Sequence, residues 1–357
     1  MKLLTYLLIA IMLMNSCKDD EAEEPIFYES YAEGMYIVTD NGISFFNYED
    51  SLAQVTNQIY RTVNNTTINN PKKIKFRGSK AYILSENYIA VVDARTFADN
   101  GIVTGFINPV DFDFASPDNR MLVVDKDDSR VKVVDLGRLE ITSDIETGDS
   151  TQPMFIISNS YKSFILNGGG SSNQTKDSTV VAIEYRDDLV AVANFEGSLL
   201  VGDNPNSAII TSSGELKVLC KGVYDPINPF YNTESSLSNI NQYSNAVYST
   251  DNLSGIYNAQ NLIGNWNNSS CYFTAGGGVY MLNPNTLNVS LIVSVNASVI
   301  NAIVESFSVN DTTTVSYEML YMNDVDSPNS IYKYNRNLSV FVDTIIVDGN
   351  IRDINFY

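Results

Sequence analysis

One pattern recurs seven times along this chain: an apolar strand, a polar turn, a second alternating strand, and an Asp, Asn or Glu at its end. These final residues are Asn47, Asp93, Asp135, Glu184, Asn241, Asn283 and Asn335. They are separated by 42 to 57 residues, with a mean interval of 48. Repeats of about 40 to 50 residues made of short alternating strands are typical of β-propellers. The sequence therefore predicts an all-β fold with seven blades.

Two further strands complete each repeat. An apolar strand precedes the hairpin and is often opened by a proline, as at Pro71, Pro109, Pro153 and Pro205. A proline at the first position of a strand removes no ladder hydrogen bond. A fourth strand follows the hairpin, and we label the four strands A to D in chain order. A pair of β-sandwiches would also space its strands regularly, but it would not explain the repeated connector and proline.

The two ends of the repeat region complement each other. The first hairpin, at 36–47, has no A strand of its own, whereas Ile351–Phe356 reads as an A strand with no hairpin after it. An inner strand without a partner would leave an open sheet edge. We therefore expect Ile351–Phe356 to join the N-terminal blade and to close a seven-bladed ring over residues 34–357.

Charge and composition exclude several classes of function. The chain has 42 acidic residues, 22 basic residues and no histidine, which gives a formal net charge of −20. Such a charge repels a phosphate backbone, so we expect no nucleic-acid partner. Without histidine there is no Ser-His-Asp triad and no His-ligated zinc. No pair of carboxylates stands out among the 42 acidic residues, so we name no catalytic residue. We expect no enzyme activity and no cofactor, and a carboxylate-dependent glycosidase or lyase is the alternative.

Two Asp-rich turns and two cysteines have structural explanations. The turns at 125–129 and 323–327 lack the central Gly and the terminal Glu of an EF-hand, and Asp, Asn and Ser are common in turns, so we expect no metal site. Cys220 and Cys271 fall in the B strands of neighbouring blades, which do not pair. We expect two buried thiols rather than a disulfide.

The N-terminal segment has the features of an export signal. Met1 and Lys2 precede a run of twelve mostly apolar residues. Such a run spans about 18 Å as a helix, less than the roughly 30 Å of a hydrocarbon core, so residues 1–16 are expected to be a signal peptide. Cys17 follows, and the arrangement resembles the lipobox of bacterial lipoproteins, whose cysteine is acylated after cleavage. An ordinary secretory signal with an incidental cysteine is the alternative.

The residues after the cysteine suggest where the protein is displayed. Lys18, Asp19 and Asp20 resemble the surface-export signal of Bacteroidota lipoproteins, a lysine followed by acidic residues. We expect residues 17–33 to form an acidic tether. The alternative to the export signal is that residues 17–25 are a solvated tether that only keeps the domain off the membrane. No other apolar run approaches eighteen residues, so the lipid would be the only membrane anchor. We expect a lipid-anchored outer-membrane protein that faces the cell exterior.

The repeats also carry a family resemblance, in the segments YIAVVDARTF, VKVVDLGRL and VGDNP. With these the chain resembles the YncE-like propellers, exported seven-bladed proteins that are common as lipoproteins on Bacteroidota. Related surface propellers capture cobalamin and pass it to a TonB-dependent transporter. The resemblance therefore implies a non-enzymatic module that captures a small nutrient, such as a corrinoid, beside such a transporter. The alternative is a protein-interaction scaffold or adhesin that binds another protein of an envelope complex.

A binding site is expected on one face of the ring. Because strand direction alternates, the B–C turns and the D–A connectors of all blades emerge on the same face. The two longest insertions, 168–178 and 222–235, both fall in B–C turns. The second carries three aromatic residues and a neighbouring amide: Tyr224, Phe230, Tyr231 and Asn232. Aromatic side chains supply contact area at small entropic cost, so these four are the candidate ligand or partner-binding residues. The alternative is that the aromatics cover the groove between blades four and five.

Overall fold

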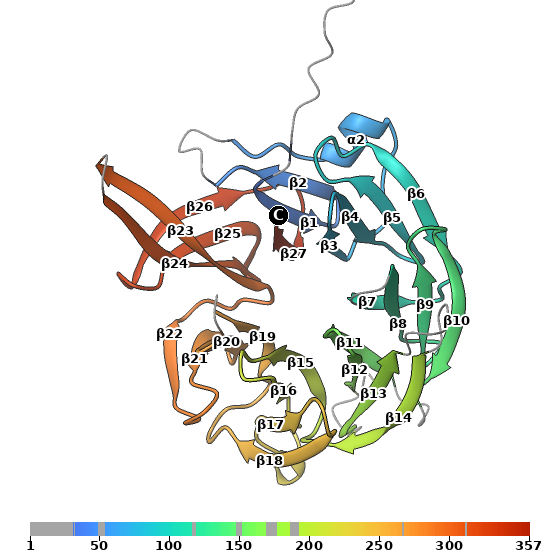
Figure 1. Cartoon of the computed structure of the whole chain (residues 1–357). Helices are drawn as coiled ribbons and strands as arrows, with labels where there is room; N and C mark the ends of the chain where they lie inside the picture. The colour runs from blue at the N-terminus through green and yellow to red at the C-terminus, as the bar shows by residue number, and fades with distance from the viewer. Residues whose placement is uncertain are drawn as a thin grey trace, which may run out of the picture. The chain divides into compact units, whose positions relative to one another are not determined.

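The computed structural model in Figure 1 describes residues 31, 33–48, 54–115, 119–147, 152–168, 177–185, 193–265, 268–310 and 313–357. Six four-stranded sheets and one three-stranded sheet form a ring of seven blades, which confirms the predicted seven-bladed β-propeller. The compact unit that contains the ring runs from Tyr31 to Tyr357. Residues 1–30, with the expected signal peptide, Cys17 and the export signal, lie outside the described residues.

The strands of each blade follow one another from the A strand to the D strand. Blade one holds β27 (Ile351–Phe356), β1 (Met35–Thr39) and β2 (Gly42–Phe46). Blade two holds β3 (Lys73–Arg77), β4 (Lys80–Leu84), β5 (Tyr88–Asp93) and β6 (Asp99–Thr104). Blade three holds β7 (Pro109–Ala115), β8 (Arg120–Asp125), β9 (Arg130–Asp135) and β10 (Glu140–Glu146). Blade four holds β11 (Pro153–Ser158), β12 (Lys162–Asn167), β13 (Thr179–Tyr185) and β14 (Ala193–Leu200).

The remaining blades have the same order. Blade five holds β15 (Pro205–Ile210), β16 (Glu215–Cys220), β17 (Ser236–Asn241) and β18 (Ala246–Asn252). Blade six holds β19 (Gln260–Gly264), β20 (Cys271–Ala275), β21 (Gly278–Leu282) and β22 (Val289–Val293). Blade seven holds β23 (Ile300–Asn310), β24 (Thr313–Asp324), β25 (Ser327–Asn335) and β26 (Val340–Ile346). Three of the four predicted prolines open an A strand, at Pro109, Pro153 and Pro205.

Strand β27 closes the ring as predicted. It pairs antiparallel with β1, so that Phe356 lies opposite Met35 and Ile354 lies opposite Ile37. Gly34 and Tyr357 extend this pairing by exchanging two backbone hydrogen bonds of 3.2 and 3.1 Å. The C-terminal segment is therefore the inner strand of blade one.

Blade one departs from the four-strand repeat in the described residues. Where its D strand is expected, Phe45 and Thr56 form a single bridge with two hydrogen bonds of 2.9 Å. The chain then forms the short helix α2 (Ile59–Asn64), which buries Ile59 and Tyr60. None of the helices in the described ranges is long and apolar enough to cross a membrane.

The D strands share an irregularity that the sequence pattern does not reveal. In blades two to seven the pairing of the D strand with the C strand shifts register once. A bulge of this kind increases the right-handed twist of the bulged strand. The outermost strand of each four-stranded blade is therefore strongly twisted.

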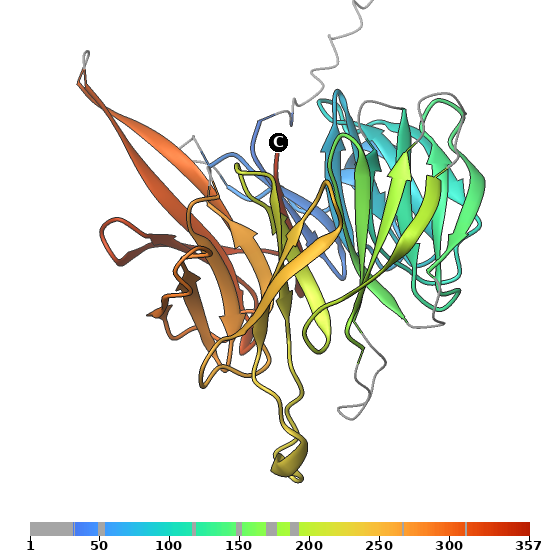
Figure 2. The ribbon, with the colours of Figure 1, turned by 60° about the horizontal axis from the view of Figure 1, so that its bottom comes forward.

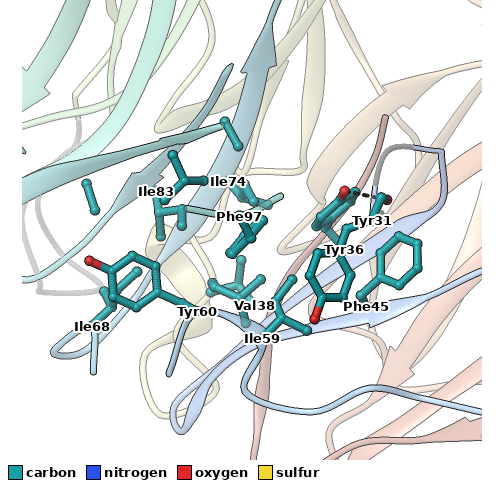
Figure 3. Close-up of a cluster of buried hydrophobic side chains, with 14 residues drawn as sticks. Tyr31, Tyr36, Val38, Phe45, Ile59, Tyr60, Ile68, Ile74, Ile83 and Phe97 are labelled. Carbon is teal, nitrogen blue, oxygen red and sulfur yellow. Dashed lines mark hydrogen bonds between the residues drawn. The ribbon is translucent and has the colours of Figure 1, made fainter. Parts of the chain in front are cut away.

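The apolar core is divided into seven clusters, one at each junction between neighbouring blades. In β1, Tyr36 and Val38 face blade two, whereas Met35 and Ile37 face blade seven. A B strand therefore buries both of its faces, which explains why it reads as an apolar run. Figure 3 shows the cluster between blades one and two, which also contains Tyr31, three residues before the expected start of the propeller at Gly34.

The two cysteines of the propeller lie in different clusters. Cys220 is buried between blades four and five, and Cys271 is buried between blades five and six. Both are free thiols, as expected. Burial raises the pKa of each thiol to about 12, so neither is a reactive thiolate near neutral pH.

Candidate functional site

Hydrogen bonds tie the B–C turns to the D–A connectors on one face of the ring, which we call the connector face. At the end of β8, the Asp125 carboxylate accepts the N–H groups of Ile107 and Asn108 at 2.8 and 2.7 Å. In blade seven, the Asn323 side-chain oxygen accepts two connector N–H groups, each at 2.9 Å. The first residues of both Asp-rich turns thus hold the connectors in place.

The insertion expected to carry the binding residues is an ordered extension of the β16–β17 hairpin. Val223 and Thr233 form a bridge at its base, and a 3-10 helix, Pro229–Tyr231, forms its end. Gly222 lies at the base with φ +74°, and a Cβ there would lie 2.3 Å from the carbonyl oxygen of Thr233. Only glycine fits this position. In Figure 2 this loop projects from the ring in one direction, and the long β23–β24 hairpin projects in the other.

The structure does not bring the four expected residues to one site. Phe230 and Tyr231 are 91% and 68% exposed, and their rings contact each other with centroids 5.4 Å apart. They do not belong to the buried cluster between blades four and five. With the 85% exposed Ile227 they form what we call the loop tip. The Asn232 side-chain oxygen accepts the N–H of Asp225 at 2.6 Å, so it stabilises the loop.

The side chain of Tyr224 lies next to the connector that leads into blade six. Its ring contacts that of Tyr257, with centroids 5.4 Å apart and planes tilted by 48°. Together they border a hollow of about 340 Å³, which we call the tyrosine pocket. The lining residues come from the loop, the connector between blades five and six, and blade six: Tyr224, Gly255, Ile256, Tyr257, Asn258, Ala275, Gly276 and Tyr280.

The tyrosine pocket combines fixed aromatic rings with free polar groups. Tyr280 is held by stacking on Phe273, with centroids 5.3 Å apart and planes 12° from parallel. Within the described part of the chain, neither the three phenol hydroxyls nor the Asn258 side-chain amide has a hydrogen-bond partner. None of the described lining residues is charged. This arrangement suits the binding of a small neutral ligand and offers no strong acid or base.

Sequence reasoning found Tyr224 but missed Tyr257, Asn258 and Tyr280. These three residues lie in a connector and in a C strand, outside any long insertion. The only sequence signal was an aromatic residue within a connector, where polar turn residues are usual. One tyrosine in one connector does not show which other side chains the fold places beside it.

A second hollow, of about 390 Å³, lies beside β23 of blade seven. It is lined by Tyr48, Val304, Glu305, Ser306 and Phe307. Glu305 is 5% exposed and forms an ion pair of 2.7 Å with Lys333. It also accepts the hydroxyl of Tyr321, whose pKa is raised by burial and by this carboxylate. The charges compensate each other, so this cluster is a structural ion pair rather than a free acid or base.

Charged side chains also link the inner strands of the ring. The fully buried Asp111 carboxylate on β7 pairs with Lys73 at 2.8 Å and with Lys75 at 3.3 Å, both on β3. Its second oxygen accepts the N–H of Ile156 on β11 at 3.2 Å. On β27, Asp353 accepts the N–H of Ile74 in the same way at 3.1 Å. These carboxylates join neighbouring blades, which gives them a structural explanation.

Comparisons with known proteins identify the fold and nothing finer. No model of a known protein family matches the chain, and no curated protein matches its sequence. Among solved structures, a proposed 6-phosphogluconolactonase from Bacteroides fragilis is similar, with a TM-score of 0.65 and 11% identity over 94% of this chain and 100% of that one. A protein from Lactobacillus plantarum has a TM-score of 0.67 and 9% identity over 91% of this chain and 99% of that one.

A third neighbour carries a different name. It is the hydrazine synthase of Kuenenia stuttgartiensis, with a TM-score of 0.63 and 14% identity over 81% of this chain and 90% of that one. Propellers with such different names share a scaffold. At sequence identities this low, the activity of one protein does not establish the activity of another. What the chain shares with all three is the β-propeller fold.

Proposed function

We propose that this protein is a non-enzymatic binding module that captures a small nutrient on its connector face. The observation that carries the proposal is the tyrosine pocket, because its described lining joins aromatic walls to unbonded polar groups and includes no charged residue. Pockets that bind small molecules combine aromatic and apolar walls with polar groups that orient the ligand. Capture needs affinity alone, which is consistent with a chain that lacks histidine.

The cellular setting of the proposal rests on sequence motifs. The Cys17 lipobox and the acidic signal Lys18–Asp20 support a lipid-anchored protein of the outer membrane that faces the exterior. The YncE-like resemblance supports a place beside a TonB-dependent transporter and supplies a corrinoid as the first ligand to test. The propeller fold agrees with this resemblance, and many unrelated proteins have the same fold.

The enzymatic alternative is the activity in the name of two structural neighbours, 6-phosphogluconolactonase. Its substrate carries a phosphate, and phosphate sites use Arg, Lys or the N–H groups of a helix N-terminus. The described lining of the tyrosine pocket contains no basic residue. The pocket therefore favours binding of a neutral molecule over chemistry on a phosphorylated one.

A second candidate function is docking to another envelope protein, as a scaffold or adhesin would do. The loop tip favours it, because Ile227 and Phe230 are 85% and 91% exposed on a projecting loop. Exposed aromatic anchors of this kind are frequent at the centres of protein interfaces.

Separate substitutions in the pocket and at the tip distinguish the two functions. Calorimetry of the purified full chain in detergent, titrated with cobalamin, cobinamide and other small nutrients, tests capture. If a compound binds, Tyr257→Ala should weaken it at least tenfold, and the double variant Phe230→Ala/Tyr231→Ala should leave it unchanged. If no compound binds, and the tip variant instead loses a co-purifying TonB-dependent transporter, capture is wrong and docking is the function.

A further inference from the structure

We infer that the ligand of the tyrosine pocket is a neutral sugar ring, meaning a puckered ring with an apolar face and several hydroxyl groups. The inference rests on the proposed function, because it names the ligand class of the same pocket. It follows from the charge, the polar groups and the shape of the pocket, each of which excludes other classes of small molecule.

The charge of the pocket excludes ionic ligands. Its described lining contains no Asp, Glu, Lys or Arg, while the chain as a whole carries a net charge of −20. A charged ligand that enters would lose hydration without gaining a counter-charge, and an anion would also be repelled by the protein. The described lining has no carboxylate for a hard cation either.

The polar groups exclude a wholly apolar ligand. The hydroxyls of Tyr224, Tyr257 and Tyr280 and the amide of Asn258 have no partner in the described residues, so water or a ligand must satisfy them. An apolar ligand would displace that water and leave donors and acceptors without hydrogen bonds, which is unfavourable. A ligand with several hydroxyl groups replaces the water, while its apolar face covers the aromatic rings.

The shape of the pocket favours a puckered ring over a planar one. The rings of Tyr224 and Tyr257 are in contact and tilted by 48°, so they do not form a parallel slot that would hold a flat ring between two faces. One face of Tyr280 is already covered by Phe273. A planar heteroaromatic ring would therefore stack on a single tyrosine face, and it brings fewer hydroxyl groups than a sugar to the unbonded phenols and amide. The volume of about 340 Å³ lies at the small end of the roughly 300 to 1,000 Å³ of ligand pockets, which suits one or two sugar rings better than a corrinoid.

The test is titration of the purified full chain with neutral saccharides. The panel contains mono- and oligosaccharides of glucose, galactose, mannose and N-acetylglucosamine, together with cobalamin and adenosine, in a zwitterionic detergent without a sugar headgroup. We expect at least one saccharide to bind. Tyr257→Phe, which keeps the ring and removes the hydroxyl, should weaken binding about fivefold, and Tyr257→Ala should weaken it more than tenfold. Tyr161→Ala removes a 65% exposed tyrosine outside the pocket and serves as the matched control.

The outcomes separate this inference from the proposed function. Saccharide binding that Tyr257→Ala removes and Tyr161→Ala keeps supports both. Binding of cobalamin or adenosine alone, with the same dependence on Tyr257, overturns the sugar inference and leaves capture in place. If nothing in the panel binds, or if a saccharide binds equally well to Tyr257→Ala, the assignment of a sugar to this pocket is wrong.

Discussion

At the scale of single residues, the carboxylates of the inner strands show how the surroundings of an aspartate set its pKa. Burial alone would raise the pKa of Asp111, but the ammonium groups of Lys73 and Lys75 overcome this effect and hold the pKa below its ordinary value. For Asp353 burial is the larger effect, and its pKa is raised. As the pH falls, protonation of Asp111 therefore destabilises the folded protein relative to the unfolded chain, whereas protonation of Asp353 stabilises it.

The fall in folding stability between pH 5 and pH 3 tests these two pKa assignments. A depressed pKa contributes stability that is present above the unfolded value, about 3.9, and is lost as the pH falls through the folded value. Asp111→Asn should therefore lower stability at pH 7 by about 1 to 3 kcal/mol and make the decline from pH 5 to pH 3 shallower. Asp353→Asn should make that decline steeper, because protonation of Asp353 no longer offsets it. Denaturant melts at several pH values measure both slopes, and equal slopes in the two variants would contradict the assignments.

At the scale of elements, β27 connects the two ends of the propeller. Ile354 is 2% exposed and packs in the cluster between blades seven and one, whereas Ile346, at the end of β26, is 55% exposed. Both are isoleucines near the closure of the ring, so they form a matched pair of substitution sites.

Ile354→Ala should destabilise the protein by about 2 to 5 kcal/mol, because it leaves a cavity at the closing junction. Ile346→Ala should change stability by no more than about 0.5 kcal/mol, because that side chain is already half in water. Urea unfolding of both variants measures the difference. If the two variants unfold at the same urea concentration, β27 does not hold the ring closed.

The sequence predicted the elements whose signal is local and periodic. B strands such as β1 bury both faces and read as apolar runs, and Ile351–Phe356 was identified because the first hairpin lacked an inner strand. Helix α2 was missed because its six residues show no full helical period. The bulges of the D strands could not be predicted from the sequence. A bulge changes which residues of two strands lie opposite each other, and it leaves the alternation of apolar and polar residues without a clear mark.

The candidate site was predicted only in part for a related reason. Tyr224 could be predicted because it lies in a long insertion, whereas Tyr257 lies in a connector and Tyr280 lies in the C strand β21. The three tyrosines come together only because blades five and six pack side by side, and this tertiary packing cannot be read from the local sequence pattern. Phe230 and Tyr231 were selected from the sequence because aromatic residues in a long insertion supply contact area, and the structure leaves both exposed.

At the scale of the whole molecule, the ring divides its features between two faces. The projecting loop and the tyrosine pocket belong to the connector face, and the long β23–β24 hairpin projects the other way. The seven junctions that hold the ring together lie between blades, so the loops on either face can vary without disturbing the core. The pocket and the loop tip therefore lie on the same face of the ring.

The proposed display on the cell surface is a prediction about the whole chain, and it can be tested without knowing the ligand. Cys17→Ser should release the protein from membranes, because the lipid attached to Cys17 would be its only membrane anchor. Replacing Lys18, Asp19 and Asp20 by Ala should keep the lipid but hide the propeller from protease added to intact cells. The purified variants should unfold at the same urea concentration as the parent, since positions 17–20 precede the compact unit that begins at Tyr31. Persistent protease sensitivity of the triple variant in intact cells would contradict the export signal, and membrane retention of Cys17→Ser would contradict the lipid anchor.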